Sequence, residues 1–140
     1  MRQTRILILA AIIAGGAVMA HAAGIKVIAN PSVSVSSITA GDLKNVFLAI
    51  KSSLGDGCHV EPVLEKAGAA HETFLKTYIG KTAASLETYY RSLVFTGKAF
   101  MPKTLPDDSA VVAYVAKTKG AIAYVTADAS TPGVKTLEVR

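Results

Sequence analysis

Hydrophobic and polar residues follow two different periods along this chain, and each change of period marks a new element. Residues 25–29 alternate, are rich in β-branched side chains and end at Asn30-Pro31, which is typical of a strand and a turn. Residues 32–37 then form a loop or a short extended piece. A helix follows, capped by Thr39, with a buried face formed at helical spacing by Leu43, Val46, Phe47 and Ile50.

The middle of the chain predicts a second strand and two successive helices. Residues 59–64 alternate as a strand, within which Pro62 favours an edge position or a bulge. The next helix starts near Ala69 and ends at Gly80, and its apolar face contains Phe74, Leu75, Tyr78 and Ile79. Thr82 or Ser85 caps a third helix, whose apolar face contains Leu86, Tyr89, Tyr90 and Leu93.

The last third predicts a loop, a helix and two strands. Residues 95–102 are expected to form the loop, and a fourth helix runs from Asp107-Asp108 to just before Gly120. Residues 121–125 are apolar, as in a central strand buried on both faces, and residues 134–139 alternate as a less buried strand. We therefore expect an α/β fold, a single layered domain with a mixed, partly parallel sheet and the aromatic side chains in its core.

The first 22 residues have the pattern of an export signal. Arg2 and Arg5 precede an uncharged apolar run, and Ala20-His21-Ala22 is an Ala-x-Ala cleavage sequence. The apolar run is short for a membrane span, which needs about 20 residues. We expect residues 1–22 to be removed as a signal peptide, leaving one domain at residues 23–140 in the periplasm or outside the cell.

Charge and cysteine content narrow the function classes. The chain has 15 basic and 10 acidic residues; without Arg2 and Arg5, 13 basic residues face 10 acidic ones, a charge of about +3. The lysines are scattered, which does not favour nucleic-acid binding. Cys58 is the single cysteine, so no internal disulfide can form, and we expect a buried, inert thiol.

The junction at residues 63–74 is the most informative stretch for function, because a predicted strand runs through small residues into a helix. The free N–H groups of a first helical turn attract anions, and small residues allow an anion to approach the backbone. Glu72 falls in that first turn, where its carboxylate would occupy the anion's place or stabilise the helix end itself. The stretch therefore predicts an anion cradle partly filled by its own side chain.

Several segments, taken in order, resemble the phosphate-binding proteins of ABC transporters. More closely, the chain is similar to the short, single-lobe, phosphate-binding-protein-like family of exported bacterial proteins. The resemblance covers about residues 27–129 and rests on residues 28–31 with 45–49, residues 60–74, residues 95–98 with Pro102, and residues 112–115 with 120–125. It implies one lobe of a type II periplasmic binding protein, similar to the second lobe of the large relatives.

The resemblance also implies where a ligand would bind. In the large relatives a loop of the form Arg-x-Asp-Gly-Ser-Gly-Thr holds phosphate. Placed on this loop, the arginine falls on Glu65 or Lys66, the aspartate on Gly68, the serine on Ala70, the second glycine on His71 and the threonine on Glu72. Because most of these ligand side chains are absent, the implied binding is weak. The implied site comprises Lys66, Ala69, Ala70, His71 and Glu72, with Thr96 and Lys98 as neighbours.

His71 has two open interpretations. We expect a surface residue, and a protonated imidazole would add a pH-sensitive contact to an anion, because the reference pKa of histidine is near 6.5.

Enzymatic chemistry has little support. The sequence contains no Gly-x-Ser-x-Gly, His-Glu-x-x-His or P-loop motif, and we expect no cofactor and no metal. Cys58 and His59 are a suggestive pair, but adjacent strand residues point to opposite faces.

Two functions therefore stay open. The first is a non-enzymatic solute-binding domain that binds a small phosphate-like anion weakly or assists phosphate transport. The second is a ligand-free interaction module that keeps the lobe fold and binds a periplasmic or membrane protein. In either case a dimer could supply the missing second wall.

Overall fold

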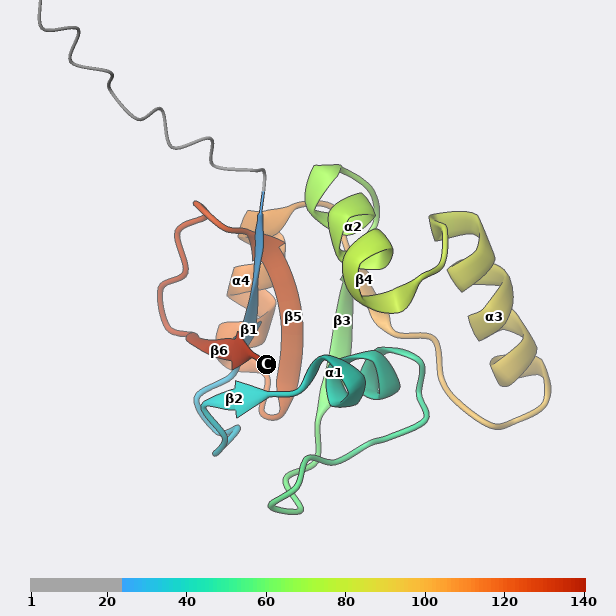
Figure 1. Ribbon diagram of the computed structural model, residues 1–140, viewed down its shortest axis with the longest axis horizontal. Coiled ribbons are helices and arrows are strands. Elements are labelled where there is room, and N and C mark those ends of the chain that lie inside the picture. The colour runs from blue at the N-terminus through green and yellow to red at the C-terminus, as the bar shows by residue number, and fades with distance from the viewer. Residues whose placement is uncertain (1–23) are drawn as a thin grey trace, which may run out of the picture.

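A computed structural model describes residues 24–140, and the expected signal peptide, residues 1–22, lies outside them. Within the described part a six-stranded sheet has the strand order β2-β6-β1-β5-β3-β4 (Figure 1). The strands are β1 (Ile25–Ala29), β2 (Ser37–Ile38), β3 (Glu61–Glu65), β4 (Lys103–Leu105), β5 (Ala121–Thr126) and β6 (Lys135–Val139).

The sheet mixes antiparallel and parallel pairs. Strand β1 runs antiparallel to both of its neighbours, β5 and β6, with Ile28 opposite Ala123 and Thr136. Strand β3 runs parallel to β5 and β4, and β2 runs parallel to β6. The expected mixed, partly parallel α/β sheet is therefore confirmed.

Local capping explains where the helices begin. Helix α1 (Ala40–Phe47) begins after Thr39, whose side chain accepts a hydrogen bond from the backbone N–H of Asp42. Thr82 and Asp107 cap α3 (Ala83–Phe95) and α4 (Asp108–Lys117) in the same way. Helix α2 (Ala69–Phe74) continues directly into the π-helical turn η1 (Leu75–Ile79), which ends at Gly80 as expected.

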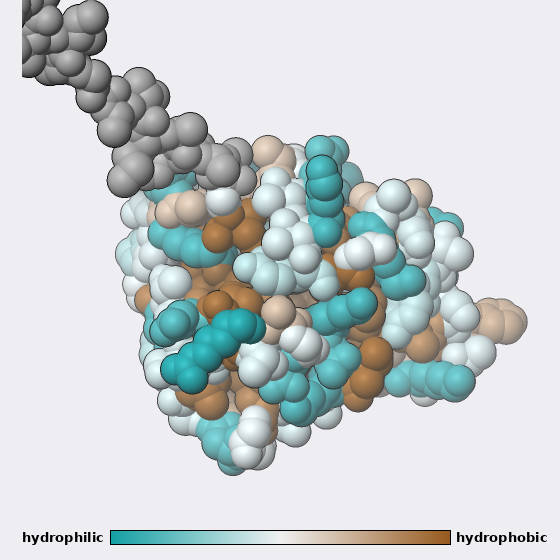
Figure 2. All heavy atoms as spheres, in the orientation of Figure 1, coloured by the Kyte–Doolittle hydropathy of each residue, from teal (hydrophilic) through white to brown (hydrophobic). Residues whose placement is uncertain are grey.

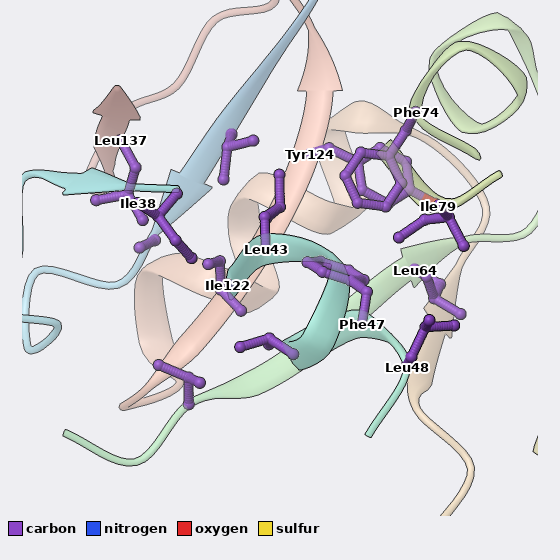
Figure 3. Close-up of a cluster of buried hydrophobic side chains, with 14 of the residues drawn as sticks. Ile38, Leu43, Phe47, Leu48, Leu64, Phe74, Ile79, Ile122, Tyr124 and Leu137 are labelled. Carbon is purple, nitrogen blue, oxygen red and sulfur yellow. The ribbon is translucent and has the colours of Figure 1, made fainter. Parts of the chain in front are cut away.

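Helices cover both faces of the sheet. Helix α4 packs on one face, where Val111, Val112 and Val115 join a cluster that includes Ile28 and Val63. The opposite face is covered by α1, α2, η1 and part of α3. Figure 3 shows apolar side chains of α1, α2 and η1 against the sheet. At the centre of this larger cluster the rings of Phe74 and Tyr124 stack with their centroids 4.0 Å apart.

Strand β5 connects the two cores, as its continuous apolar run predicts. Ile122 and Tyr124 belong to the cluster under α1 and α2, whereas Ala121, Ala123 and Val125 belong to the cluster under α4. All five residues are fully buried. The expected central strand, buried on both faces, is confirmed.

Several local expectations were wrong. Helix α1 ends at Phe47 and Ala49 takes a left-handed conformation, so Ile50 leaves the apolar face and is 66% exposed. Pro62 does not lie in an edge strand, because β3 sits between β5 and β4, although β4 pairs only with Val63, Leu64 and Glu65. The short strands β2 and β4 were not foreseen.

Side-chain burial also departs from expectation at three positions. Cys58 is half-buried rather than buried, and its Sγ lies 3.8 Å from the carbonyl oxygen of Ser32. Phe95 and Phe100, expected in the core, are 92% and 94% exposed. These two rings flank the connection that follows α3.

Candidate anion-binding site

The strand-to-helix junction is formed by β3, a three-residue turn and α2. The backbone N–H of Lys66 donates to the carbonyl oxygen of Leu105, which holds the end of β3 against β4. Gly68 then turns the chain into α2 with φ 115°, a conformation that side chains with a Cβ rarely adopt. The first helical hydrogen bond runs from the N–H of Glu72 to the carbonyl oxygen of Gly68. The N–H groups of Ala69, Ala70 and His71 therefore precede the helical ladder.

His71 is buried, with only 5% of its surface exposed, so the expectation of a surface residue was wrong. It lies on the side of α2 that faces β5, and its Nδ1 is 2.5 Å from the hydroxyl oxygen of Tyr124. That oxygen also accepts a hydrogen bond from the backbone N–H of Glu65 at 3.0 Å. The Tyr124 proton is therefore free to be donated to Nδ1, which assigns the proton of a neutral imidazole to Nε2.

Burial lowers the pKa of His71 below its usual value of 6.5, and the nearby Glu72 carboxylate opposes this shift. The side chain is consequently a neutral N–H donor at neutral pH rather than a cation. The electrostatic attraction that a protonated His71 would give an anion requires acidic conditions.

A pocket of about 270 Å³ lies between the β3–β4 edge, α2 and α3. Its polar lining includes Lys66, His71 and Thr104 together with the acids Glu65 and Glu87, and its apolar lining includes Leu64, Leu86 and Tyr90. Lys66 is exposed and forms no ion pair within residues 24–140. The structure thus brings together Lys66 and His71 from the predicted site and adds Thr104 from β4, a strand too short and too exposed for the sequence pattern to indicate.

Glu72 points elsewhere. It is exposed and lines a separate hollow with Lys76 and Lys81, and it makes no side-chain hydrogen bond to the start of α2 in the described part of the chain. Its carboxylate therefore does not cap the cradle by a hydrogen bond, although Glu72 lies in the first turn of α2, where the helix dipole favours an acid as expected.

The two outlying candidates do not join the site. Lys98 lines a different pocket of about 390 Å³, together with Lys51 and His59. Thr96 follows the last residue of α3, and its hydroxyl donates to the carbonyl oxygen of Ser92 at 2.9 Å. Both residues belong to the connection between α3 and β4.

Several solved structures have a similar fold over part of their length. A protein of Clostridium perfringens assigned as a phosphate ABC transporter substrate-binding protein, solved with bound phosphate, matches 83% of this chain and 44% of its own, with 15% identity and a TM-score of 0.65. PstS from Borrelia burgdorferi matches with 12% identity and a TM-score of 0.63, over 83% of this chain and 47% of its own. An ABC-type phosphate transport receptor from Vibrio cholerae matches with 12% identity and a TM-score of 0.55, over 83% and 46%.

The fold is that of one lobe of a phosphate-binding protein. The chain spans less than half the length of the solved structures it matches. No model of a known protein family matches it, and no curated protein sequence does. None of the helices in residues 24–140 is long and apolar enough to cross a membrane.

The lobe also contains a pair of acids that the sequence reasoning did not single out. Glu65, at the end of β3, is 4% exposed, and its Oε1 has no conventional hydrogen-bond donor in the described structure. Burial and the neighbouring Asp108 raise the pKa of Glu65 to about 8, so its carboxyl holds a proton at neutral pH. Period-two alternation with the buried Val63 would have indicated this position.

Asp108 is the ionised member of this acid pair. Burial acts to raise its pKa, but hydrogen bonds from Glu65 and Thr126 outweigh burial and lower the pKa. The hydroxyl of Thr126 donates to Asp108 Oδ2 at 2.5 Å. A protonated Glu65 and an ionised Asp108 therefore form an acid pair between β3 and the start of α4.

Other chemistry has less support in this lobe. No group of three His, Cys, Asp or Glu side chains within residues 24–140 is arranged to hold a metal ion. The Sγ of Cys58 contacts the carbonyl oxygens of Ser32 and His59.

Proposed function

We propose that this protein is an exported, non-enzymatic solute-binding lobe that holds a small anion, phosphate or a small carboxylate, weakly at the start of α2. The proposal rests chiefly on one observation. The backbone N–H groups of Ala69, Ala70 and His71 lie outside the helical ladder, and the side chains of Lys66 and the buried His71 line one pocket with Thr104. Backbone donors and a lysine are groups that anions prefer.

The matched structures support this class of ligand, because the Clostridium perfringens protein of the same fold was solved with bound phosphate. Weak binding follows from the side chains. A single exposed lysine replaces the arginine of the resembling loop, and lysine lacks the planar fork that binds two oxygens at once. A dissociation constant on the order of 1 mM is expected.

Titration calorimetry with sodium phosphate, sulfate and acetate tests the proposal. At pH 7.5 the Lys66→Ala variant should bind each anion about tenfold more weakly, because the substitution removes the charged donor of the site. Lys117→Ala is the matched control, because Lys117 is an exposed lysine at the far end of α4 and should change nothing. In a second titration at lower pH, the affinity for sulfate, whose charge does not change, should rise once the pH has fallen through the lowered pKa of His71.

Two results would contradict the site. One is the absence of heat with all three anions at both pH values. The other is an equal effect of Lys66→Ala and Lys117→Ala, which would indicate a general charge effect rather than a site.

The alternative is a module that has kept the lobe fold, lost its ligand and binds a periplasmic or membrane protein, or assists phosphate transport through such a partner. The absence of arginine, serine and threonine from residues 66–72 favours it. This alternative would be favoured if calorimetry detects no heat of binding with any of the anions and light scattering shows a stable dimer.

Export is part of the same proposal. The basic start, apolar run and Ala-x-Ala sequence of residues 1–22 support cleavage before Ala23. The intact mass of protein recovered from the exported fraction tests it, and a full-length mass with no exported form would contradict it.

A further inference from the structure

The connection after α3 exposes an unusual amount of apolar surface. Phe95 and Phe100 are 92% and 94% exposed, and Val94 and Met101 are 42% and 51% exposed. We call these four residues together with Lys98 the α3 tip. Isolated exposed apolar side chains are common, but two almost fully exposed phenylalanines in one short segment, one of them next to a half-exposed methionine, are unusual.

The α3 tip lies at one extreme of the molecule. In Figure 1 α3 and the connection that follows it form the end opposite to β1, β2 and β6. Figure 2 shows apolar surface standing out from the outline at this end, and Phe100, Met101 and Lys98 also line part of the pocket of about 390 Å³. A protruding apolar group is suited to entering a soft surface, whereas a protein partner would need a matching cavity.

The charged side chains in and next to the α3 tip are all positive. Residues 92–106 contain Lys98 and Lys103 and no aspartate or glutamate. Lys98 is exposed between the two phenylalanines and forms no ion pair in the described chain. Apolar side chains next to uncompensated lysines complement a surface with anionic headgroups above an apolar interior.

Part of the backbone around the α3 tip is already hydrogen-bonded internally. The N–H of Gly97 donates to the carbonyl oxygen of Val94, and the N–H groups of Lys98 and Ala99 donate to that of Leu93. The hydroxyl of Thr96 donates to the carbonyl oxygen of Ser92. Because unsatisfied polar groups keep loops out of apolar surroundings, these internal hydrogen bonds lower the cost of bringing the turn to a lipid interface.

From these observations we propose that the α3 tip docks the protein on a membrane surface containing anionic lipid. Phe95 and Phe100 insert among the acyl chains, and Lys98 stays at the level of the headgroups. The contact is reversible, because a few inserted side chains bury far less apolar surface in the membrane than a segment that spans it. Phe95, Phe100 and Lys98 do not line the anion pocket, so the docking does not depend on the proposed solute binding.

Co-sedimentation with vesicles tests the proposal. The cleaved chain should partition onto vesicles of phosphatidylglycerol and phosphatidylcholine, and less onto phosphatidylcholine alone. The double variant Phe95→Ser with Phe100→Ser should lower the partition coefficient about tenfold or more, and Lys98→Ala should reduce only the excess due to anionic lipid. Lys117→Ala is the control for general charge.

Fluorescence adds a readout of insertion, because the chain contains no tryptophan. The emission of Phe100→Trp should shift to shorter wavelength when vesicles are added. Ser130→Trp, in an exposed turn after β5, should not shift. Circular dichroism confirms that each variant is folded.

The proposal is overturned by an absence of vesicle binding, by binding that the double serine variant retains, or by equal shifts of both tryptophans. If the tip docks on a protein instead of lipid, the chain should not co-sediment with vesicles of any composition.

Discussion

The hydroxyl of Tyr124 lies 2.5 Å from Nδ1 of His71 and, at the same time, accepts the backbone N–H of Glu65 from the neighbouring strand. One buried oxygen therefore joins β5, α2 and β3 immediately beneath the proposed site. Tyr124→Phe should lower the free energy of unfolding by about 1–3 kcal/mol, because it leaves a buried N–H and a buried imidazole nitrogen without partners. Urea denaturation measures this.

Tyr114→Phe is the control for that variant. Tyr114 is half-buried, and its hydroxyl donates to Glu61 at 3.2 Å. Loss of this hydroxyl should lower the free energy of unfolding by about 0.5 kcal/mol or less, because water can replace the missing hydrogen bond. Equal losses in the two variants would contradict the linking role of Tyr124.

His71 should make the protein less stable in acid. Its pKa is lowered in the folded state, so below pH 6.5 the unfolded chain binds a proton that the folded chain refuses. The stabilising contribution is present above pH 6.5 and is lost as the pH falls through the folded pKa. Denaturation from pH 7 to 4 should show a slope that His71→Gln removes, and NMR titration should place the pKa below 6.5. A normal titration would refute the buried neutral state.

Glu65 should act in the opposite direction. Its pKa is raised from 4.5 to about 8, so between these values the folded chain holds a proton that the unfolded chain has released. Stability due to this group is full below pH 4.5 and is lost as the pH rises towards 8. Glu65→Gln should raise the free energy of unfolding at pH 8 by on the order of 1–3 kcal/mol, because a neutral amide keeps a donor for Asp108.

The half-buried Glu61, in the same strand, provides the comparison. Glu61→Gln should leave the slope above pH 5 intact. If both variants abolish it, the slope does not originate in the acid pair.

Gly120 should be the glycine least able to accept a side chain. It has φ 77°, and a Cβ there would lie 2.6 Å from the carbonyl oxygen of His59. Gly57 has a similar φ of 80° but open space around it. We expect Gly57→Ala to cost about 1 kcal/mol from conformation alone and Gly120→Ala to cost about 3 kcal/mol or more, as measured by thermal unfolding. Similar losses would show that the contact with His59 relaxes freely.

The sequence predicts those elements of the fold that have a local signal, such as hydrophobic periodicity or a helix cap. It does not predict elements that form only through tertiary pairing. Five consecutive apolar residues identify β5 as a central strand, and Thr39 and Asp107 identify helix starts, because these signals are local. Strand β4 has two exposed residues out of three and exists through pairing with β3, a contact that no local pattern encodes.

The site shows the same division. Gly68 and the helix start at Ala69 follow from residue type. The burial of His71 was missed because its position was taken from a resembling loop, although its spacing of three and four residues from Phe74 and Leu75 puts it on the buried face of α2. Nothing local distinguishes the exposed Phe95 from the buried Phe74, since only the packing of α3 against α1 decides which ring finds a partner.

The place of β1 in the sheet sets the order in which the fold can be completed. The strand is the first in the chain, yet its neighbours are β5 and β6, and Ile25 pairs with Thr126 about 100 residues later. A nascent chain that ends before β5 has no partner on either side of β1, so its central ladder cannot close. Long-range pairing of this kind slows folding. A growing polypeptide with this topology can complete its sheet only after its last two strands have been made.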